Sequence, residues 1–284
     1  MQIISLDQVP LEELVAAFND AFTDYAVTVE MTAARLKNLI IARSVRLDLS
    51  SGIMAGERLK AFVLTGSRRI EDLPTAYNAA TGVRCAYQRQ GLGKRLLSHT
   101  MALLEAAGYR RYLLEVITTN TAAIGLYTDQ GFAERRLLNC YSALPSEAST
   151  DGLAPGTGAA VTPLGPEWAL RMGPLLSQRP SWQNAATAVN AIARHCRLIF
   201  AGTLASPAAM AVLDPRTGSI HQFGFAAGAA DAARQVMVRA LQLSATDTVH
   251  LANVDAGDGR MNAFLQEAGF ARPISQLEME YCWL

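Results

Sequence analysis

The chain has 284 residues, of which 50% are hydrophobic and 18% are charged. This composition supports one or two sizeable cores and excludes a wholly disordered chain. Lysine plus arginine and aspartate plus glutamate both total 25, which argues against a protein whose main task is to bind nucleic acid or an anionic membrane. No apolar run reaches the roughly 18–20 residues that span a bilayer, and the N-terminus does not resemble a secretory signal.

Four cysteines lie far apart in the sequence, at Cys85, Cys140, Cys196 and Cys282. They form neither a disulfide framework nor the spacing of a zinc site, which favours a reducing compartment. We therefore expect a cytoplasmic protein without a metal.

The first half predicts a mixture of helices and strands. The strongest helix prediction follows Gly91, because Leu92 and Leu96 begin an apolar stripe at helical spacing that Gly108 ends. In chain order, we expect strands at 3–4, 50–54, 59–65, 76–87, 111–117 and 134–143, and helices at 11–18, 32–41, 92–107 and 120–130. This order predicts a mixed α/β or α+β domain.

Small, turn-forming residues at 143–158 interrupt this pattern. We interpret 145–159 as a linker between a first domain at 1–144 and a second at 160–284. A shift of 138 residues places Gly131-Phe132 on Gly269-Phe270, and it also aligns two strand segments. We favour a diverged internal duplication over coincidence.

The segment from Gln88 to Lys94 joins a predicted strand to the strongest predicted helix. The first turn of a helix has unpaired N–H groups and positive potential. Gly91 and Gly93 lack a Cβ, so a diphosphate could approach the backbone, and Arg89 would add positive charge. An ordinary tight connection is the alternative, and the spacing departs from dinucleotide and P-loop motifs.

In this context the segment resembles the GNAT superfamily of acetyl-CoA-dependent N-acetyltransferases. The motifs that carry the resemblance over about 83–132 are Gln88-x-x-Gly91-x-Gly93, Leu114-Glu115-Val116, Asn120, Ala123, Leu126-Tyr127 and Gly131-Phe132. It implies tandem GNAT folds, each a twisted, mostly antiparallel sheet flanked by helices. The motifs look most similar to the branch that acetylates peptide N-terminal amines, but the preceding 75–83 segment does not, so the substrate is not carried over.

The resemblance also implies which residues bind acetyl-CoA. The diphosphate would lie on the glycine turn and the pantetheine arm along Val83–Cys85, where the backbone N–H of Cys85 would polarise the thioester carbonyl. Asn120 would cap the short helix and contact the same arm. The implied coenzyme-binding set is Val83, Arg84, Cys85, Gln88, Arg89, Gln90, Gly91, Leu92, Gly93, Lys94, Asn120, Ala123 and Tyr127.

Acetyl transfer to an amine needs a base for the amine and an acid for the departing thiolate. The resemblance assigns the acid to Tyr127, with a buried core tyrosine as the alternative. We propose Glu115 as the base, directly or through a water, because an apolar strand should raise its pKa. The alternative is a structural carboxylate paired with Arg84 or Arg110.

Four residues are candidates for the wall that holds the acceptor amine: Phe22, Asp24, Tyr25 and Tyr141. They come from the loop between the first two helices and from a late strand, and Asp24 could hold an ammonium group. A capping aspartate with surface aromatic residues is an equal alternative.

The second half has lost the residues that carry the chemistry, since the shift turns Glu115 into Asn253 and Tyr127 into Leu265. Asp231 also brings a carboxylate to the expected anion site, where it should repel coenzyme A. We interpret this half as a degenerate copy that shapes the substrate cleft or a contact within a homodimer.

We therefore expect an N-acetyltransferase that moves an acetyl group from acetyl-CoA to a small-molecule, amino-acid or peptide amine through a ternary complex, with no nucleic acid or membrane partner. A non-catalytic coenzyme-A sensor or scaffold is the first alternative, and a purely structural protein is the second.

Overall fold

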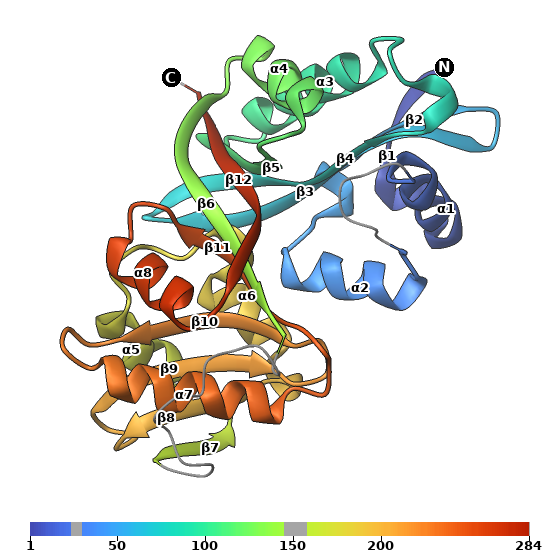
Figure 1. Cartoon of the computed structure of the whole chain (residues 1–284). Helices are drawn as coiled ribbons and strands as arrows, with labels where there is room; N and C mark the ends of the chain where they lie inside the picture. Colours follow the sequence, from blue (N-terminus) through green and yellow to red (C-terminus); the bar gives the residue numbers. More distant parts are fainter. Residues whose placement is uncertain (24–29, 145–157, 284) are drawn as a thin grey trace. The chain divides into compact units, whose positions relative to one another are not determined.

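A computed structural model describes residues 1–23, 30–144 and 158–283 (Figure 1). They form two compact units: unit 1 is Met1–Arg135 with Glu278–Leu284, and unit 2 is Arg136–Leu277. Each unit is a sheet covered by helices, which confirms the expected mixed α/β architecture. Within the described ranges, no helix combines the length and apolar character that a membrane crossing requires.

The sheet of unit 1 has the strand order β1-β2-β3-β4-β5-β12. Strands β1 to β4 pair antiparallel with their neighbours in this order, whereas β4 and β5 are parallel. The elements are β1 (Gln2–Ser5), α1 (Leu11–Ala21), α2 (Ala33–Ala42), β2 (Ser51–Ala55), β3 (Arg58–Ile70), β4 (Leu73–Val83), α3 (Leu92–Ala106), β5 (Arg111–Ile117), α4 (Thr121–Asp129) and the end of β12 (Ala271–Cys282).

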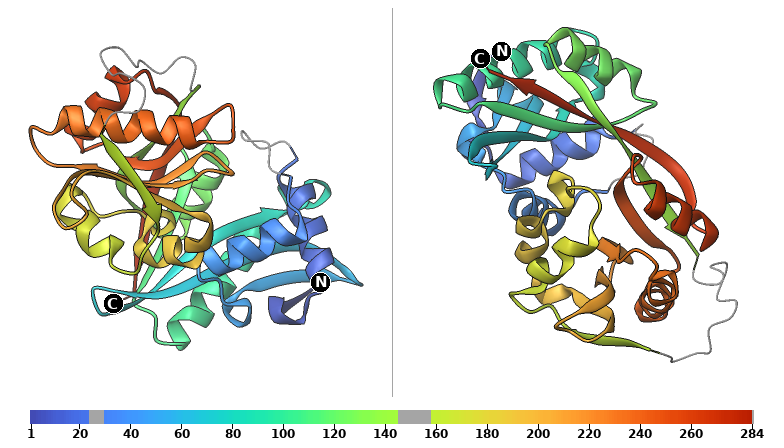
Figure 2. Two further views of the ribbon diagram at one scale, coloured as in Figure 1. Left: turned by 90° about the horizontal axis from the view of Figure 1, so that it is seen from below. Right: turned by 90° about the vertical axis from the view of Figure 1, so that its left-hand side faces the viewer.

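Successive residues of β3 contact different helices, one on each face of this sheet. Phe62 stacks on Phe18 of α1, with ring centroids 5.7 Å apart. Its neighbours Ala61 and Val63 share a core cluster with Leu92 of α3. Because successive strand residues point to opposite faces, α1 and α3 cover opposite faces, as Figures 1 and 2 show.

The sheet of unit 2 has the order β12-β6-β11-β10-β9-β8-β7. From β8 onward its elements repeat the order found in unit 1 from β2 to α4 (Figure 1). They are β6 (Ala133–Ala143), β7 (Ala159–Pro163), α5 (Trp168–Met172), α6 (Ala186–Ala191), β8 (Arg197–Gly202), β9 (Pro207–Asp214), β10 (Ser219–Phe225), α7 (Ala230–Leu243), β11 (Val249–Asp255), α8 (Gly259–Glu267) and most of β12.

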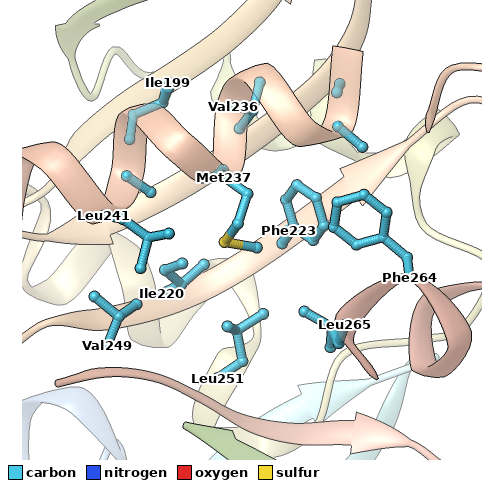
Figure 3. Packing of buried hydrophobic residues seen from close by; sticks show 14 of the residues in the cluster. Ile199, Ile220, Phe223, Val236, Met237, Leu241, Val249, Leu251, Phe264 and Leu265 are labelled. Atoms are coloured by element: carbon cyan, nitrogen blue, oxygen red, sulfur yellow. The ribbon is translucent and has the colours of Figure 1, made fainter. Parts of the chain in front are cut away.

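Helices α7 and α8 close one face of this sheet (Figure 3). Val236 and Met237 of α7 lie in one buried cluster with Ile220 and Leu251 of the sheet. Phe264 of α8 adds an aromatic contact with Phe223 of β10, with centroids 5.4 Å apart. Burial of large apolar side chains of this kind contributes roughly 1.5–3 kcal/mol per residue.

The boundary between the units differs from the one expected at 144. Strand β6 pairs with β11 in the register Val249↔Ala143 to Asp255↔Leu138, so most of it belongs to unit 2. The end of β12 returns to unit 1, where the N–H of Trp283 donates to the carbonyl of Arg110 at 3.1 Å. Most of the expected linker, 145–157, lies outside the described residues, and β7 begins at Ala159.

Candidate active site

The central feature of unit 1 is the separation of β4 from β5. Their pairing runs from Thr75↔Arg111 to Asn78↔Leu114. The register of β4 against β3 then shifts by one residue, which places a β-bulge at Ala79. Bulges bend a strand and re-aim its backbone. Beyond this point β4 follows β3 alone, so an opening begins where the two parallel strands part.

The backbone of β4 lines this opening. The N–H of Arg84 donates to Lys60 of β3 at 2.9 Å, and the register of β4 on β3 is regular from Ala80 to Val83. Backbone groups alternate along an antiparallel strand. The peptide groups of Thr81 and Val83 therefore face away from β3 and toward the opening. The side-chain amide of Gln88 binds this edge of β4, because its Nε2 donates to the carbonyl of Val83 at 3.2 Å.

The predicted glycine turn lies at the end of β4 and starts α3. Gly91 caps the helix with φ 75°, and nothing lies within 4 Å of the Cβ that another residue would have there. An anion can therefore approach the helix N-terminus without meeting a side chain. Leu92 is 7% exposed and packs in the core, so only its backbone can serve a ligand. Gln90 donates to the carbonyl of Ala86 at 3.2 Å, which stabilises the turn.

Positive charge surrounds this turn on the outside. Arg89 and Lys94 are exposed, and Lys94 forms an exposed ion pair with Asp129 at 3.4 Å. Such surface pairs are weak and are easily exchanged for another anion. The structure thus places Gln88 to Lys94 in one turn at the open end of the β4–β5 separation.

Two of the predicted coenzyme contacts are corrected by the structure. Strand β4 ends at Val83, and Cys85 begins a short 3₁₀ turn. The N–H of Cys85 donates to Oδ1 of Asp20 at 2.8 Å, so it is not free to polarise a carbonyl. The guanidinium of Arg84 is buried and pairs with Glu13 at 2.9 Å and with Asp20 at 3.1 Å. Both residues therefore attach α1 to the end of β4.

Glu115 lies in the middle of β5, beside Tyr77, which was not among the candidate residues. Register places Tyr77 opposite Leu113, hence on the same face as Glu115. The hydroxyl of Tyr77 donates to Oε2 of Glu115 at 3.0 Å. Arg84, one of the expected partners, is instead bound to Glu13 and Asp20. No local signal identifies Tyr77, because the contact depends on how β4 and β5 are paired.

A partly buried cation, Arg68, lies on the same face of the sheet. Burial lowers the pKa of Arg68 to about 10, and the charges of Tyr77 and Glu115 act in the opposite direction. Arg68 donates from Nε to Ser44 Oγ at 3.0 Å and from Nη2 to the carbonyl of Ala42 at 2.7 Å. Arg68 and the hydroxyl of Tyr77 thus both lie on the face of the sheet that carries Glu115.

Tyr127 approaches from the other face of the sheet. It is 8% exposed, and its ring meets Phe132 edge-on, with centroids 5.8 Å apart. Phe132 in turn contacts Tyr112 of β5, at 5.5 Å. Tyr112 and Glu115 are three residues apart on one strand, so they point to opposite faces. The candidate acid and the candidate base therefore flank β5 from its two faces.

Helix α4 packs against the glycine turn through Leu126. Asn120 caps this helix by accepting from the N–H of Ala123 at 3.1 Å, which confirms the predicted cap. Leu126 lies 3.5 Å, and Val83 3.7 Å, from the position of a Cβ on Gly93. Gly93 thus allows α3, α4 and the end of β4 to pack closely.

The predicted acceptor wall is only partly described. Phe22 stacks on Phe18 at the end of α1, with centroids 4.6 Å apart. Asp24 and Tyr25 lie outside the described residues. The assignment of Tyr141 to this wall is corrected: it is 1% exposed in the core of unit 2, and its hydroxyl lies 2.8 Å from Oδ1 of Asn262. Strand β6 leaves unit 1 and takes Tyr141 with it.

Unit 2 has a comparable opening with different side chains. Strands β10 and β11 pair only at Ser219↔His250. At the position of Glu115, Asn253 is bound to Ser181 at 3.0 Å and to Gln276 at 2.9 Å. At the position of Tyr127, Leu265 is fully buried. A small pocket of about 70 Å³ lies here, lined by side-chain amides and by residues of β10 and β11.

The helix that follows this opening carries an acidic first turn. Gly228 has φ 77°, close to that of Gly91, but Asp231 stands in the first turn of α7 and pairs with Arg234 at 3.3 Å. Negative charge near a helix N-terminus competes with an incoming anion. Unit 2 therefore lacks the charge and the side chains that unit 1 presents.

Comparison with known proteins identifies the segment that carries the site. Residues 53–132 match the family model described as the acetyltransferase (GNAT) family. A [Ribosomal protein bS18]-alanine N-acetyltransferase of Salmonella typhimurium is 38% identical over 93 residues, 33% of this chain and 60% of that protein. Its Escherichia coli K12 counterpart is 40% identical over 84 residues, 30% and 54% of the two chains. The chain thus spans a little over half the length of these relatives.

Solved structures match the chain over nearly its whole length. A tandem GNAT protein from the clavulanic acid biosynthesis pathway has a TM-score of 0.71 at 13% identity and covers 99% of this chain and 98% of its own. A putative acetyltransferase from Pyrococcus horikoshii has a TM-score of 0.70 at 15% identity, covering 100% and 89%. At these identities the likeness concerns the fold alone, and it confirms the expected tandem GNAT fold.

Proposed function

We propose that unit 1, whose residues 53–132 match the acetyltransferase (GNAT) family, is an N-acetyltransferase that moves the acetyl group of acetyl-CoA to a primary amine. The observation that carries the proposal is the opening between β4 and β5. An accessible helix N-terminus lies at its end, and Glu115 and Tyr127 lie on the two faces of β5 beside it. A protein that only binds coenzyme A needs the helix N-terminus but neither Glu115 nor Tyr127.

The turn and the edge of β4 fit the donor. The first-turn N–H groups of α3 would hold the diphosphate, with Arg89 and Lys94 supplying charge. The peptide N–H groups of Thr81 and Val83, which face away from β3, would bind the pantetheine arm and replace Cys85 as the source of a backbone donor. When bound, acetyl-CoA supplies the activated acyl group as a thioester.

The residues on either side of β5 handle the protons. Glu115 takes a proton from the acceptor ammonium, so that the nitrogen lone pair can form the new bond to the acyl carbon. Tyr77 orients the carboxylate for this step. As the carbon–sulfur bond breaks, Tyr127 donates its proton to the departing sulfur. The attacking nitrogen then loses its second proton, which replaces the one that Tyr127 gave up, so that the products are a neutral amide, a thiol and the proton held by Glu115.

The first acceptor to test is a peptide with an N-terminal alanine, because relatives that share this segment are named as alanine N-acetyltransferases. Small amines and amino-acid derivatives complete the panel. The assay incubates the full chain with acetyl-CoA and each amine, and it measures thiol release together with the mass of the acetylated product. Amine-dependent release is expected for at least one class.

Tyr127→Phe should lower kcat about 100-fold, the lower end of what acid catalysis contributes, with little change in KM for acetyl-CoA. The matched control is Tyr109→Phe, which removes a buried hydroxyl that contacts Ser67 in the same unit. Unchanged turnover in Tyr127→Phe would remove this residue as the acid. Acetyl-CoA binding without thiol release for any amine would instead support the sensor or scaffold.

A further inference from the structure

Tyr127 and four further aromatic rings form a continuous cluster. Tyr127 meets Phe132 at 5.8 Å, and Phe132 meets both Tyr112 at 5.5 Å and Tyr281 at 5.7 Å. Trp283 closes the cluster, stacking on Tyr112 at 6.3 Å and meeting Tyr281 edge-on at 5.1 Å. Aromatic pairs at such distances contribute about 0.5–1.5 kcal/mol beyond the area they bury.

Tyr281 and Trp283 come from a part of the chain about 150 residues beyond the others. The preceding residues of β12 belong to unit 2, whereas Glu278–Leu284 belong to unit 1. Polar contacts hold this end in place. Glu280 pairs with Arg135 at 2.5 Å and lies 3.7 Å from Arg111, and the N–H of Trp283 donates to the carbonyl of Arg110 at 3.1 Å.

The ring of Tyr281 also packs against the turn that ends α4. Gly131 has φ 87°, and a Cβ at this position would lie 3.2 Å from the ring of Tyr281. The next N–H, of Phe132, donates back to the carbonyl of Tyr127 at 3.1 Å. The ring of Tyr281 thus covers the turn, and that turn is hydrogen-bonded to Tyr127 itself.

We propose that Tyr281 and Trp283 are positioning residues for Tyr127, so that the transfer site of unit 1 is complete only when the end of β12 is seated. The proposal rests on the proposed function, in which Tyr127 is the proton donor. Misplacing a reacting group by about 1 Å can cost roughly 100-fold in rate. The aromatic cluster restricts the last turn of α4, and with it the direction of the hydroxyl.

The test compares Trp283→Leu and Tyr281→Leu with Trp168→Leu in the full chain. Trp168 is 2% exposed, compared with 8% for Trp283, and it lies in unit 2. The two cluster variants should lower kcat about 10- to 100-fold and leave KM for acetyl-CoA within about twofold of the wild type, and Tyr281→Phe should recover most of the rate. An equal loss of kcat in Trp168→Leu, or an unchanged kcat in both cluster variants, would overturn the proposal.

A second measurement does not require turnover. Protein labelled with 3-fluorotyrosine gives a fluorine NMR signal for Tyr127, assigned by its absence in Tyr127→Phe. Trp283→Leu should shift or broaden this signal and change its titration, whereas Trp168→Leu should not. A signal unchanged in Trp283→Leu would overturn the positioning role. Absence of acetyl transfer by the wild type with any amine would count against the proposed function. In that case the fluorine signal would still test whether Trp283 positions Tyr127.

Discussion

Asp20, near the end of α1, shows how one carboxylate joins distant segments. It accepts from the backbone N–H of Cys85 at 2.8 Å and pairs with Arg84 at 3.1 Å. Burial alone would raise its pKa, but these hydrogen bonds and the charge of Arg84 outweigh burial, so the pKa lies below its ordinary value of 3.8. The ionised form therefore stabilises the connection between α1 and the segment that leads to the glycine turn.

A carboxylate whose pKa is lowered on folding stabilises the protein above its unfolded pKa, and that contribution disappears as pH falls through the folded pKa. We expect Asp20→Asn to reduce the free energy of unfolding by about 0.5–1 kcal/mol at pH 7, a value discounted because the side chain is partly exposed. The difference in Tm from the wild type should shrink as pH falls below 3.8, the ordinary pKa of the aspartate.

Thermal unfolding followed by circular dichroism at several pH values measures this effect. Asp129→Asn is the control, because its carboxylate forms an exposed ion pair with Lys94. A stability difference in Asp20→Asn that stays constant from pH 7 to pH 3 would contradict the assigned role.

At the scale of elements, the two units differ at the start of equivalent helices. The turns before α3 and α7 each contain a glycine with positive φ, Gly91 at 75° and Gly228 at 77°, and each leaves open space where a Cβ would be. The backbone shape is thus alike in both units. The difference lies in charge, since Asp231 stands in the first turn of α7 and no acidic residue stands in that of α3.

This similarity offers a matched pair of variants. Gly91→Glu and Gly228→Glu should each cost about 1–2 kcal/mol of backbone strain, but only Gly91→Glu should also abolish coenzyme binding, through bulk and repulsion. At about 100 times its dissociation constant, a ligand adds roughly 2.7 kcal/mol of stability. Thermal shifts with acetyl-CoA should therefore disappear in Gly91→Glu and persist in Gly228→Glu. A shift lost only in Gly228→Glu would place the coenzyme in unit 2.

At the scale of the whole molecule, the two units exchange the ends of their last strands. Most of β6 pairs within unit 2, and the end of β12 completes unit 1. Strands β6 and β12 are hydrogen-bonded neighbours in the sheet order. Without Glu278–Leu284, unit 1 would lose the rings that cover Tyr112 and Phe132, and the partner of Arg135.

A fragment of residues 1–135 should therefore be less stable than one in which a glycine-serine linker attaches residues 278–284 to it. Uncovering the aromatic rings forfeits a few kcal/mol, and we expect Tm to differ by at least about 10 °C. Circular dichroism and size-exclusion chromatography of both fragments would measure this. Equal Tm values would show that the end of β12 contributes nothing to the fold of unit 1.

The amino-acid sequence by itself determined the features that depend on residues a few positions apart. The stripe that starts at Leu92 defines α3, and Gly91 marks its beginning. Asn120 caps α4, and Gly131 ends it in a left-handed turn. Helix periodicity, capping and positive φ are local properties, so the glycine turn and the order of elements could be predicted from a single sequence.

The tertiary structure alone decided which of these features meet. The pairing of β4 with β5 places Tyr77 on Glu115, and Asp20 occupies the amide of Cys85 from 65 residues away. The exchange of strand ends moved Tyr141 into unit 2 and brought Trp283 to the cluster behind Tyr127. Strand register and strand partners depend on contacts between remote segments, and the alternation of side chains along a strand is the same whichever partner it has.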